Sequence, residues 1–444
     1  MAPFHVTTAA ASAEALGSVA SIELVARNCR LRNYTKISKV PTVDVKGDFV
    51  AYASPDSTYA VTRQLMDNAK KDILIGIYDF SAGYMKDILL SAMQRGVSVS
   101  LMLDLDGVPG EEAIFNELKK FGCQSVPAPS CASENASYFA SSHEKVIVID
   151  GSWTLVQSGN YSKNSIPFNE IDGGDPDSFV TGNRDMGVAI CSKPLAAFFT
   201  KVLRSDMKLE LDAEVIAPQK AKKAAPDLVE AVPELIPPKL FPSKRFTPSD
   251  TVKVTPVLTP DNYMDVVPDF LESATKSIFI EQQYIRGRQA QVTDLLAAMK
   301  RAKDRNAGLD VRIILGKLFG SKDIQKEKEN LAYIKKTFGL KLGDNIRFID
   351  TKRFVHCHNK TIIVDDEKVL VSSQNWSTTA VSTNREAGLL FRYPAIARYF
   401  SSIFGSDWST AARVLPRPRP ATITPKALSL GQFLEVSPAD YQEV

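Results

Sequence analysis

Two copies of one spacing, His-x-Lys-x-x-x-x-Asp, occur at matching places in the two halves of the chain. This repeat limits the possible folds more than any other feature, because it requires two similar units. Each copy is followed at the same offset by a Ser and an Asn. The two sets are His143, Lys145, Asp150, Ser158 and Asn160, and His358, Lys360, Asp365, Ser373 and Asn375. The chain has only four histidines, so the use of two of them here predicts a duplicated architecture.

Each copy has the pattern of a β-hairpin. In the first copy, residues 146–149 are strand-like and residues 153–156 have the pattern of the returning strand. A two-residue Gly151-Ser152 loop would place position 143 opposite 160 and position 145 opposite 158. The His, Lys, Ser and Asn of the copy would then share one face of the hairpin. The second copy predicts the same register around an Asp366-Glu367 loop.

The aspartate that ends each motif, Asp150 or Asp365, falls on the other face in this register. Both belong to the candidate catalytic set as motif members, but we expect them to fix the turn. A third element follows each hairpin, Asn183-Arg184-Asp185 in the first half and Asn384-Arg385-Glu386 in the second. A carboxylate there could hydrogen-bond an imidazole and hold its tautomer. Asp185 and Glu386 therefore complete the candidate catalytic set.

The first copy carries an acidic insertion. Asn160 and Asn183 are 23 positions apart, whereas Asn375 and Asn384 are 9 apart, a difference of 14. The insertion contains four carboxylates, at Glu170, Asp172, Asp175 and Asp177. Because it leaves and returns beside the motif, we expect it at the mouth of the site.

Two sets of His, Lys and Asn are suited to binding and cleaving a phosphodiester. Lysine and asparagine donors, together with the Ser hydroxyls, can bind the phosphate oxygens where charge develops. One imidazole can attack phosphorus while the other protonates the leaving oxygen and then deprotonates the incoming water or alcohol. His356, two residues before His358, has Ser141 as its counterpart in the first half. It either lines this pocket or occupies an ordinary surface position.

At these residues the chain resembles the phospholipase D superfamily, whose signature is His-x-Lys-x4-Asp followed by a small-Ser-x-Asn stretch. Ser372-Ser373-Gln374-Asn375 matches closely, whereas Gln157 departs at the small first position of the other copy. The resemblance implies two halves about a pseudo-twofold axis, with the active site between them. It also implies that His143 is the nucleophile forming a phosphohistidine, that His358 is the acid and base, and that neither metal nor cofactor is needed.

The repeat extends beyond the motifs and predicts an α/β fold, with two pseudo-twofold-related α/β/α sandwich lobes. Each half has a Pro-Asp turn, a helical stretch, a buried strand, an amphipathic helix and a second buried strand. The expected organisation is an N-terminal extension over 1–49, a first lobe over 50–216, a Pro/Lys/Ala-rich linker over 217–250, a second lobe over 251–413 and a tail over 414–444.

The substrate is less constrained, because the superfamily includes phospholipases, nucleases and phospholipid synthases. A net charge of +3 is only mildly basic, whereas a nucleic-acid groove usually shows clustered Lys and Arg. The acidic insertion would repel a polyanion and tolerate a cationic head group. We therefore favour a glycerophospholipid substrate, hydrolysed or transferred at a membrane surface. A metal-independent DNA or RNA phosphodiesterase is the alternative, and an inactive lipid- or nucleic-acid-binding module is a distant third.

Three further sequence features bear on the cellular localisation of the protein. No apolar run approaches the ~20 residues needed to span a bilayer, so we expect a peripheral protein. Residues 1–26 lack Lys and Arg, which is unlike a signal peptide. The sequons at Asn160 and Asn375 would place glycans on proposed site residues. These features favour the bacterial cytoplasm, with secretion left open if a signal has been removed. The oligomeric state does not follow from the sequence.

Overall fold

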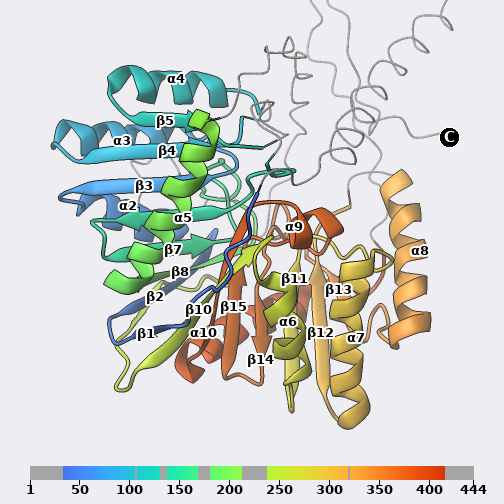
Figure 1. Cartoon of the computed structure of the whole chain (residues 1–444). Helices are drawn as coiled ribbons and strands as arrows, with labels where there is room; N and C mark the ends of the chain where they lie inside the picture. The colour runs from blue at the N-terminus through green and yellow to red at the C-terminus, as the bar shows by residue number, and fades with distance from the viewer. Residues whose placement is uncertain are drawn as a thin grey trace, which may run out of the picture.

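The computed structural model describes residues 34–105, 108–130, 138–168, 181–212, 238–318 and 321–415. Within them the chain forms two eight-stranded mixed sheets, one in each half of the molecule (Figure 1). The strand orders are β5-β4-β3-β6-β7-β8-β2-β9 and β1-β10-β16-β15-β14-β11-β12-β13. The prediction of a duplicated α/β architecture is confirmed.

The first lobe follows the expected alternation of strands and helices. Its elements are β2 (Phe49–Ser54), α2 (Thr58–Asp67), β3 (Asp72–Ile77), α3 (Gly83–Gln94), β4 (Ser98–Leu103), α4 (Glu111–Phe121), β5 (Gln124–Pro127), β6 (Lys145–Ile149), β7 (Trp153–Gln157), β8 (Asp185–Cys191) and α5 (Lys193–Asp212). Strands β3, β4 and β5 are parallel, and β6, β7 and β8 form the antiparallel part that carries the first motif.

The second lobe repeats this order. Its elements are β10 (Val252–Thr259), α6 (Tyr263–Glu272), β11 (Ser277–Gln282), α7 (Ala290–Arg305), β12 (Asp310–Leu315), α8 (Ser321–Phe338), β13 (Ile346–Phe348), β14 (Ile362–Val364), β15 (Lys368–Ser372), α9 (Thr378–Ser382), β16 (Glu386–Arg392) and α10 (Pro394–Thr410). No described helix is both long enough and apolar enough to cross a bilayer.

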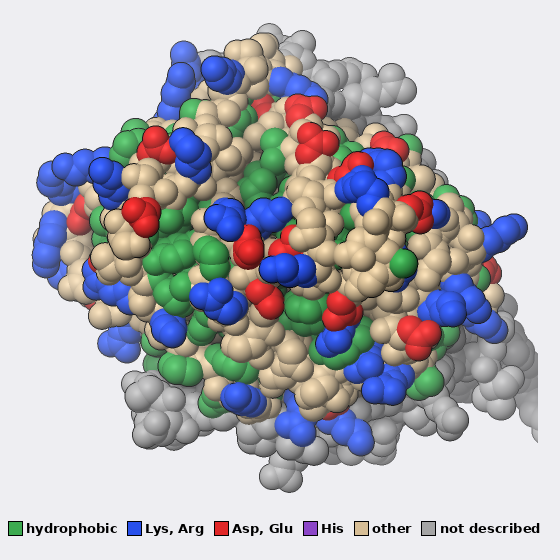
Figure 2. Space-filling model, turned by 90° about the horizontal axis from the view of Figure 1, so that it is seen from below, with side chains coloured by type: hydrophobic (Ala, Val, Ile, Leu, Met, Phe, Trp, Pro, Cys, Tyr) green, Lys and Arg blue, Asp and Glu red, His purple; other side chains and the backbone are tan. Residues whose placement is uncertain are grey.

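Alternate strand residues divide the core into layers, because neighbouring side chains point to opposite faces of a sheet. In β3, Ile73 and Ile75 pack outward with side chains of α2, α3 and α4. Leu74 instead joins a central core that also contains Val371 of β15 and Phe400 of α10. The two lobes are therefore joined by a shared apolar layer. Figure 2 shows one face of the resulting surface, on which Lys and Arg side chains are interspersed with Asp and Glu.

Two short strands cross the boundaries drawn from the sequence. Strand β1 (Val43–Val45) lies in the range predicted as an N-terminal extension, yet it pairs with β10 of the second lobe. Strand β9 (Lys244–Phe246) lies in the range predicted as a linker, yet it pairs with β2 of the first lobe. Each sheet thus ends in a strand supplied from outside its own lobe.

The predicted register of both motif hairpins is wrong by one residue. Ile149 pairs with Trp153 and Val364 pairs with Lys368, so each loop has three residues, 150–152 and 365–367. The cause is the loop backbone. The first two residues of each loop have positive φ, at 53° and 58° in the first and 59° and 55° in the second. A slip of one residue reverses the faces, so the Ser of each copy does not share a face with its own His and Lys.

Candidate active site

The site forms where the start of each motif meets the third element of the other half. The backbone N–H of His143 donates to the carbonyl of Arg385 (2.7 Å), and that of His358 donates to the carbonyl of Arg184 (3.0 Å). The N–H of Arg385 in turn donates to Ser141 (2.8 Å). These main-chain hydrogen bonds bring the two motifs together at the interface between the lobes.

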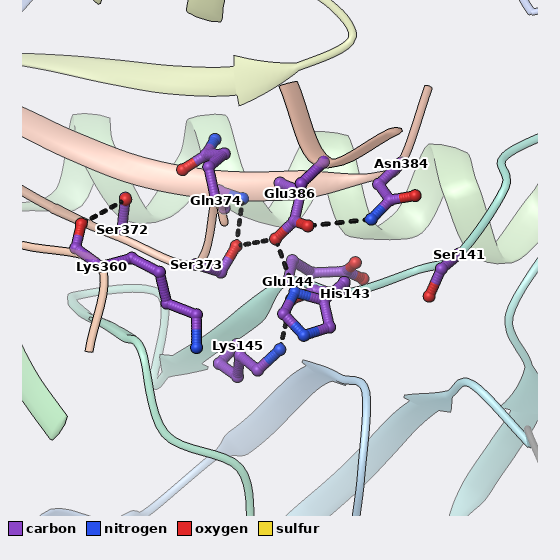
Figure 3. A network of polar contacts seen from close by, with 12 residues as sticks. Ser141, His143, Glu144, Lys145, Lys360, Ser372, Ser373, Gln374, Asn384 and Glu386 are labelled. Atoms are coloured by element: carbon purple, nitrogen blue, oxygen red, sulfur yellow. Dashed lines mark hydrogen bonds and ion pairs between the residues drawn. The ribbon is translucent and has the colours of Figure 1, made fainter. Parts of the chain in front are cut away.

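Each histidine is paired with a carboxylate from the opposite lobe. His143 Nδ1 lies 2.8 Å from Glu386 Oε2, and His358 Nδ1 lies 3.1 Å from Asp185 Oδ1. Figure 3 shows the first of these pairs, with Lys145 and Lys360 close to it. Because Nδ1 is engaged in both rings, Nε2 is the nitrogen available for chemistry.

The two serines of the motifs hold these carboxylates. Ser158 Oγ donates to Asp185 Oδ1 (2.8 Å) and Ser373 Oγ donates to Glu386 Oε2 (2.5 Å). Both serines are fully buried. Their observed position behind the carboxylates differs from the predicted contact with substrate, and the one-residue shift in hairpin register explains the difference.

The two motif lysines are fully buried between the lobes. Lys145 Nζ donates to the carbonyl of His143 (2.5 Å), and Lys360 Nζ donates to the carbonyl of His358. Burial lowers the pKa of Lys145 to about 8 and that of Lys360 to about 7, although nearby carboxylates such as Glu386 and Asp185 act in the opposite direction. An anionic phosphate entering the site would favour both ammonium groups.

The same environment keeps both imidazoles uncharged. Burial, followed by the charges of Lys145 and Lys360, holds the pKa of His143 well below its usual value. Burial and Lys360 lower the pKa of His358 to about 4. At neutral pH the free protein therefore presents two neutral imidazoles beside the two motif lysines.

The two pseudo-equivalent carboxylates differ in their pKa values. Burial raises the pKa of Glu386 to about 8 despite the opposing charge of Lys145. Burial also acts to raise the pKa of Asp185, but His358 and Lys360 together hold it below the usual value. The acid facing His143 is thus more readily protonated than the acid facing His358.

The motif asparagines follow the buried motif serines by two positions and are themselves almost completely buried. Asn160 is 8% exposed and Asn375 is 6% exposed. Neither side-chain oxygen has a hydrogen-bond partner among the described residues. A side-chain amide also carries two N–H donors, so contact of these asparagines with phosphate oxygens stays a prediction.

The motif aspartates lie at the turns. The carboxylate of Asp150 accepts hydrogen bonds from the backbone N–H groups of Lys70, Lys71 and Asp72 at 2.7–3.1 Å. Asp365 does the same with residues 275–277 at 2.7–3.0 Å. Each aspartate therefore fixes the hairpin loop against the start of the neighbouring strand, and neither bonds an imidazole.

His356 is buried and does not occupy an ordinary surface position. Its Nδ1 accepts a hydrogen bond from the backbone N–H of Lys317 (2.8 Å). Burial, followed by the nearby charges of His358 and Lys360, lowers its pKa to about 3. His356 is thus a neutral residue packed beside the second motif.

The two arginines of the third elements form buried ion pairs that could not be predicted from the sequence. Arg184 bonds Asp56 of its own lobe and Asp407 of the other, at 2.8 and 2.7 Å. Arg385 bonds Asp261 and Asp206 in the mirrored arrangement, both at 2.7 Å. The Pro-Asp turns that contain Asp56 and Asp261 were a repeat signal, but nothing local in the sequence linked them to these arginines.

The acidic insertion, with Glu170, Asp172, Asp175 and Asp177, lies outside the described residues. Within the described part of the chain, no group of three or more His, Cys, Asp or Glu is arranged to hold a metal ion.

A comparison with known protein families shows to which family the chain belongs. The family model "Cardiolipin synthase, PLD-like domain" matches residues 62–207 and 267–408, one segment in each lobe. The chain belongs to the phospholipase D-like family. Both matched segments contain one complete motif, so the family repeat and the structural repeat coincide.

The proteins similar to this chain include a curated relative and a solved structure. Mitochondrial cardiolipin hydrolase of Danio rerio is 32% identical over 71 residues, which are 16% of this chain and 31% of that protein. The match thus spans less than a third of that relative's length. The crystal structure of phosphatidylserine synthase from Haemophilus influenzae Rd KW20 has a TM-score of 0.59 at 14% identity, covering 88% of this chain and 91% of that one. This second likeness supports the two-lobe fold.

Proposed function

We propose that the protein is a phosphodiesterase that cleaves the head-group side of glycerophospholipids through a phosphohistidine on His143. The observation that carries the proposal is the crossed pairing of two imidazoles with carboxylates of opposite lobes, with two buried lysines between them. Family membership supports the same chemistry.

In the first step, Nε2 of His143 attacks phosphorus. A P–N bond forms, the bond from phosphorus to the head-group oxygen breaks, and His358 donates a proton to the departing oxygen. The pKa of His358 is about 4 without substrate. The phosphate anion must therefore raise its proton affinity on binding, as an adjacent negative charge does.

In the second step, His358 removes a proton from water, which attacks phosphorus while the P–N bond to His143 breaks. Phosphatidate leaves and His143 is again neutral. An alcohol in place of water would give transfer to a new head group by the same sequence of bonds. Lys145, Lys360, Asn160 and Asn375 donate to the phosphate oxygens in both steps.

Glycerophospholipids are proposed as substrates because the matching family and both similar proteins carry names of phospholipid enzymes. The mild net charge of +3 is consistent with this choice, since binding a nucleic-acid backbone usually needs clustered cations.

The proposal is tested with purified protein on vesicles of phosphatidylcholine, phosphatidylglycerol or cardiolipin, and on plasmid and single-stranded DNA. Released head group, phosphatidate and nicked DNA are measured with and without EDTA. Phosphatidate formation that survives EDTA and is lost in His143→Ala is expected. Cleavage of DNA without cleavage of lipid would show that the protein is a nuclease. If neither substrate were cleaved, the remaining interpretation would be an inactive lipid- or nucleic-acid-binding module.

A further inference from the structure

An aromatic residue contacts the catalytic histidine of the first lobe. Tyr78 follows the last residue of β3, and its ring lies with its centroid 4.7 Å from that of His143, tilted by 58°. Lys145 Nζ lies 5.1 Å from the centroid of the same ring. One half-buried ring therefore contacts both chemical groups of the first motif.

The second lobe has no such ring at the equivalent place. Ile77 pairs with Lys145, and continuing the β11–β14 register two residues from the Ile280–Ile362 pair places Gln282 beside Lys360. The counterpart of Tyr78 is therefore Gln283. Among the described residues, no aromatic ring forms an equivalent contact with His358. The two motifs are repeated, but the ring that contacts His143 is replaced by Gln283 at the equivalent position of the second lobe.

We propose that Tyr78 is a positioning residue that excludes water from one face of His143 and directs the ammonium of Lys145, and so makes the two histidines inequivalent. The assignment rests on the proposed function, because positioning matters only if His143 reacts. A ring at this distance supplies apolar contact to the imidazole. It also lies within the roughly 6 Å over which an aromatic ring attracts an ammonium group.

The ring of Tyr78 should influence the pKa of His143. Burial is the largest cause of the lowered pKa of His143, ahead of the charges of Lys145, Lys360 and His358. The facing carboxyl group is that of Glu386 on β16, whose Oε2 lies 2.8 Å from His143 Nδ1. Replacing the ring with a small polar side chain admits water without altering any of these charges. The pKa of His143 should then move up towards its ordinary value.

The test compares Tyr78→Gln, which copies the residue of the second lobe, with Tyr78→Phe, which keeps the ring. Tyr78→Leu serves as a second variant if Tyr78→Gln fails to fold. Turnover is measured on bis(p-nitrophenyl) phosphate as a function of pH. Misplacing a reacting group by about 1 Å can cost ~100-fold in rate. We therefore expect a 10- to 100-fold loss of kcat/KM in Tyr78→Gln, with the acidic limb of its profile moved to higher pH, and a near-wild-type profile in Tyr78→Phe.

Histidine ring NMR provides a readout that does not require turnover. With His143→Gln used only to assign the signals, His143 should titrate at higher pH in Tyr78→Gln than in wild type or Tyr78→Phe. In Tyr78→Leu, which is apolar but not aromatic, we expect reduced turnover with a smaller change in titration. Unchanged His143 titration in Tyr78→Gln, or equal losses of turnover in the Phe and Gln variants, would overturn the proposal. A wild-type protein that cleaves no diester would instead refute the proposed function, while the NMR comparison would still decide the role of Tyr78.

Discussion

Arg184 of the first lobe and Asp407 of the second form a buried ion pair across the interface, with Nε and Oδ2 2.7 Å apart and side-chain exposures of 0% and 3%. Arg385 and Asp206 form the mirrored pair, also at 2.7 Å. Each arginine is the neighbour in sequence of an acid that holds a histidine of the other lobe. The two third elements, Asn183-Arg184-Asp185 and Asn384-Arg385-Glu386, therefore both join the lobes and supply the acids of the site.

Breaking this pair should destabilise the protein strongly. Asp407→Asn leaves the guanidinium of Arg184 buried with one carboxylate fewer, and removing one partner of a buried pair typically costs about 3–5 kcal/mol. Asp44→Asn is the matched control, because the pair of Asp44 with Lys253 has side chains 62% and 76% exposed and such pairs contribute at most about 1 kcal/mol. Urea denaturation gives both free energies of unfolding. Equal values for the two variants would show that the pair does not join the lobes.

The two acids that hold the histidines should respond differently to amide substitution. Glu386, whose pKa is raised to about 8 mainly by burial, is largely protonated at pH 7. Asp185 is ionised, because His358 and Lys360 outweigh the effect of burial. Asp185→Asn removes a charge as well as a hydrogen-bond acceptor, whereas Glu386→Gln resembles the protonated acid. We expect Asp185→Asn to lower kcat by about 10²- to 10⁴-fold, as loss of an orienting carboxylate can, and Glu386→Gln to cost less. The reverse order in steady-state kinetics at pH 7 would contradict the assigned protonation states.

Glu281 should contribute to a fall in the unfolding free energy between about pH 4.5 and 8. Burial raises its pKa from 4.5 to about 8, with Asp407 adding to the shift and Arg184 opposing it. In this window the folded state binds a proton at Glu281 that the unfolded state has lost. The stabilisation of the folded state by this bound proton is therefore complete below pH 4.5, and it is lost as the pH rises through 8.

Glu281→Gln cannot titrate, yet its side-chain oxygen can still accept the hydrogen bond from Asn359 Nδ2, which lies 2.9 Å from the carboxylate. The decline in the unfolding free energy from pH 5 to pH 8 should therefore be shallower in Glu281→Gln than in wild type. Identical slopes in urea titrations across this range would exclude a proton on Glu281 in the folded protein.

The acidic insertion of the first lobe should bias the protein towards lipids over polyanions. Replacing Asp172, Asp175 and Asp177 by Asn removes three negative charges from a segment that starts and ends near the motif. Turnover of phosphatidylcholine should fall relative to a soluble diester with an uncharged leaving group. Any residual DNA cleavage should rise at low salt, where charges are least screened. A ratio that does not change would return the nuclease alternative to near parity with the lipid one.

Much of the site follows from the sequence, because the two motif copies are local patterns with strong strand signals on either side. The buried Val and Ile runs before Asp150 and Asp365 predict β6 and β14, and the third elements predict the carboxylates near the histidines. The crossed pairing of His143 with Glu386 could not be predicted, since the two residues are 243 positions apart and only the packing of the lobes brings them together.

The hairpin register and the two short edge strands could not be predicted from the local sequence, for different reasons. The hairpin register depends on positive φ at Asp150 and Asp365, a conformation that Asp adopts only occasionally. Strands β1 and β9 have three residues each, too few for an alternating pattern to be recognised. The contact of Tyr78 with His143 could not be predicted either, because it is set by where β3 ends.

In the proposed mechanism the two lobes form one site, in which His143 carries the phosphoryl group and His358 moves the proton. The most direct measurement is mass spectrometry of the protein quenched with acid-free denaturant during turnover of a short-chain phosphatidylcholine, in wild type, His143→Ala and His358→Ala. We predict a phosphatidyl adduct on the peptide containing His143 in wild type. It should be absent in His143→Ala, which lacks the nucleophile, and strongly reduced in His358→Ala, which cannot protonate the departing choline oxygen. An adduct on the peptide containing His358, or full turnover in either histidine variant, would contradict the proposed roles of the two histidines.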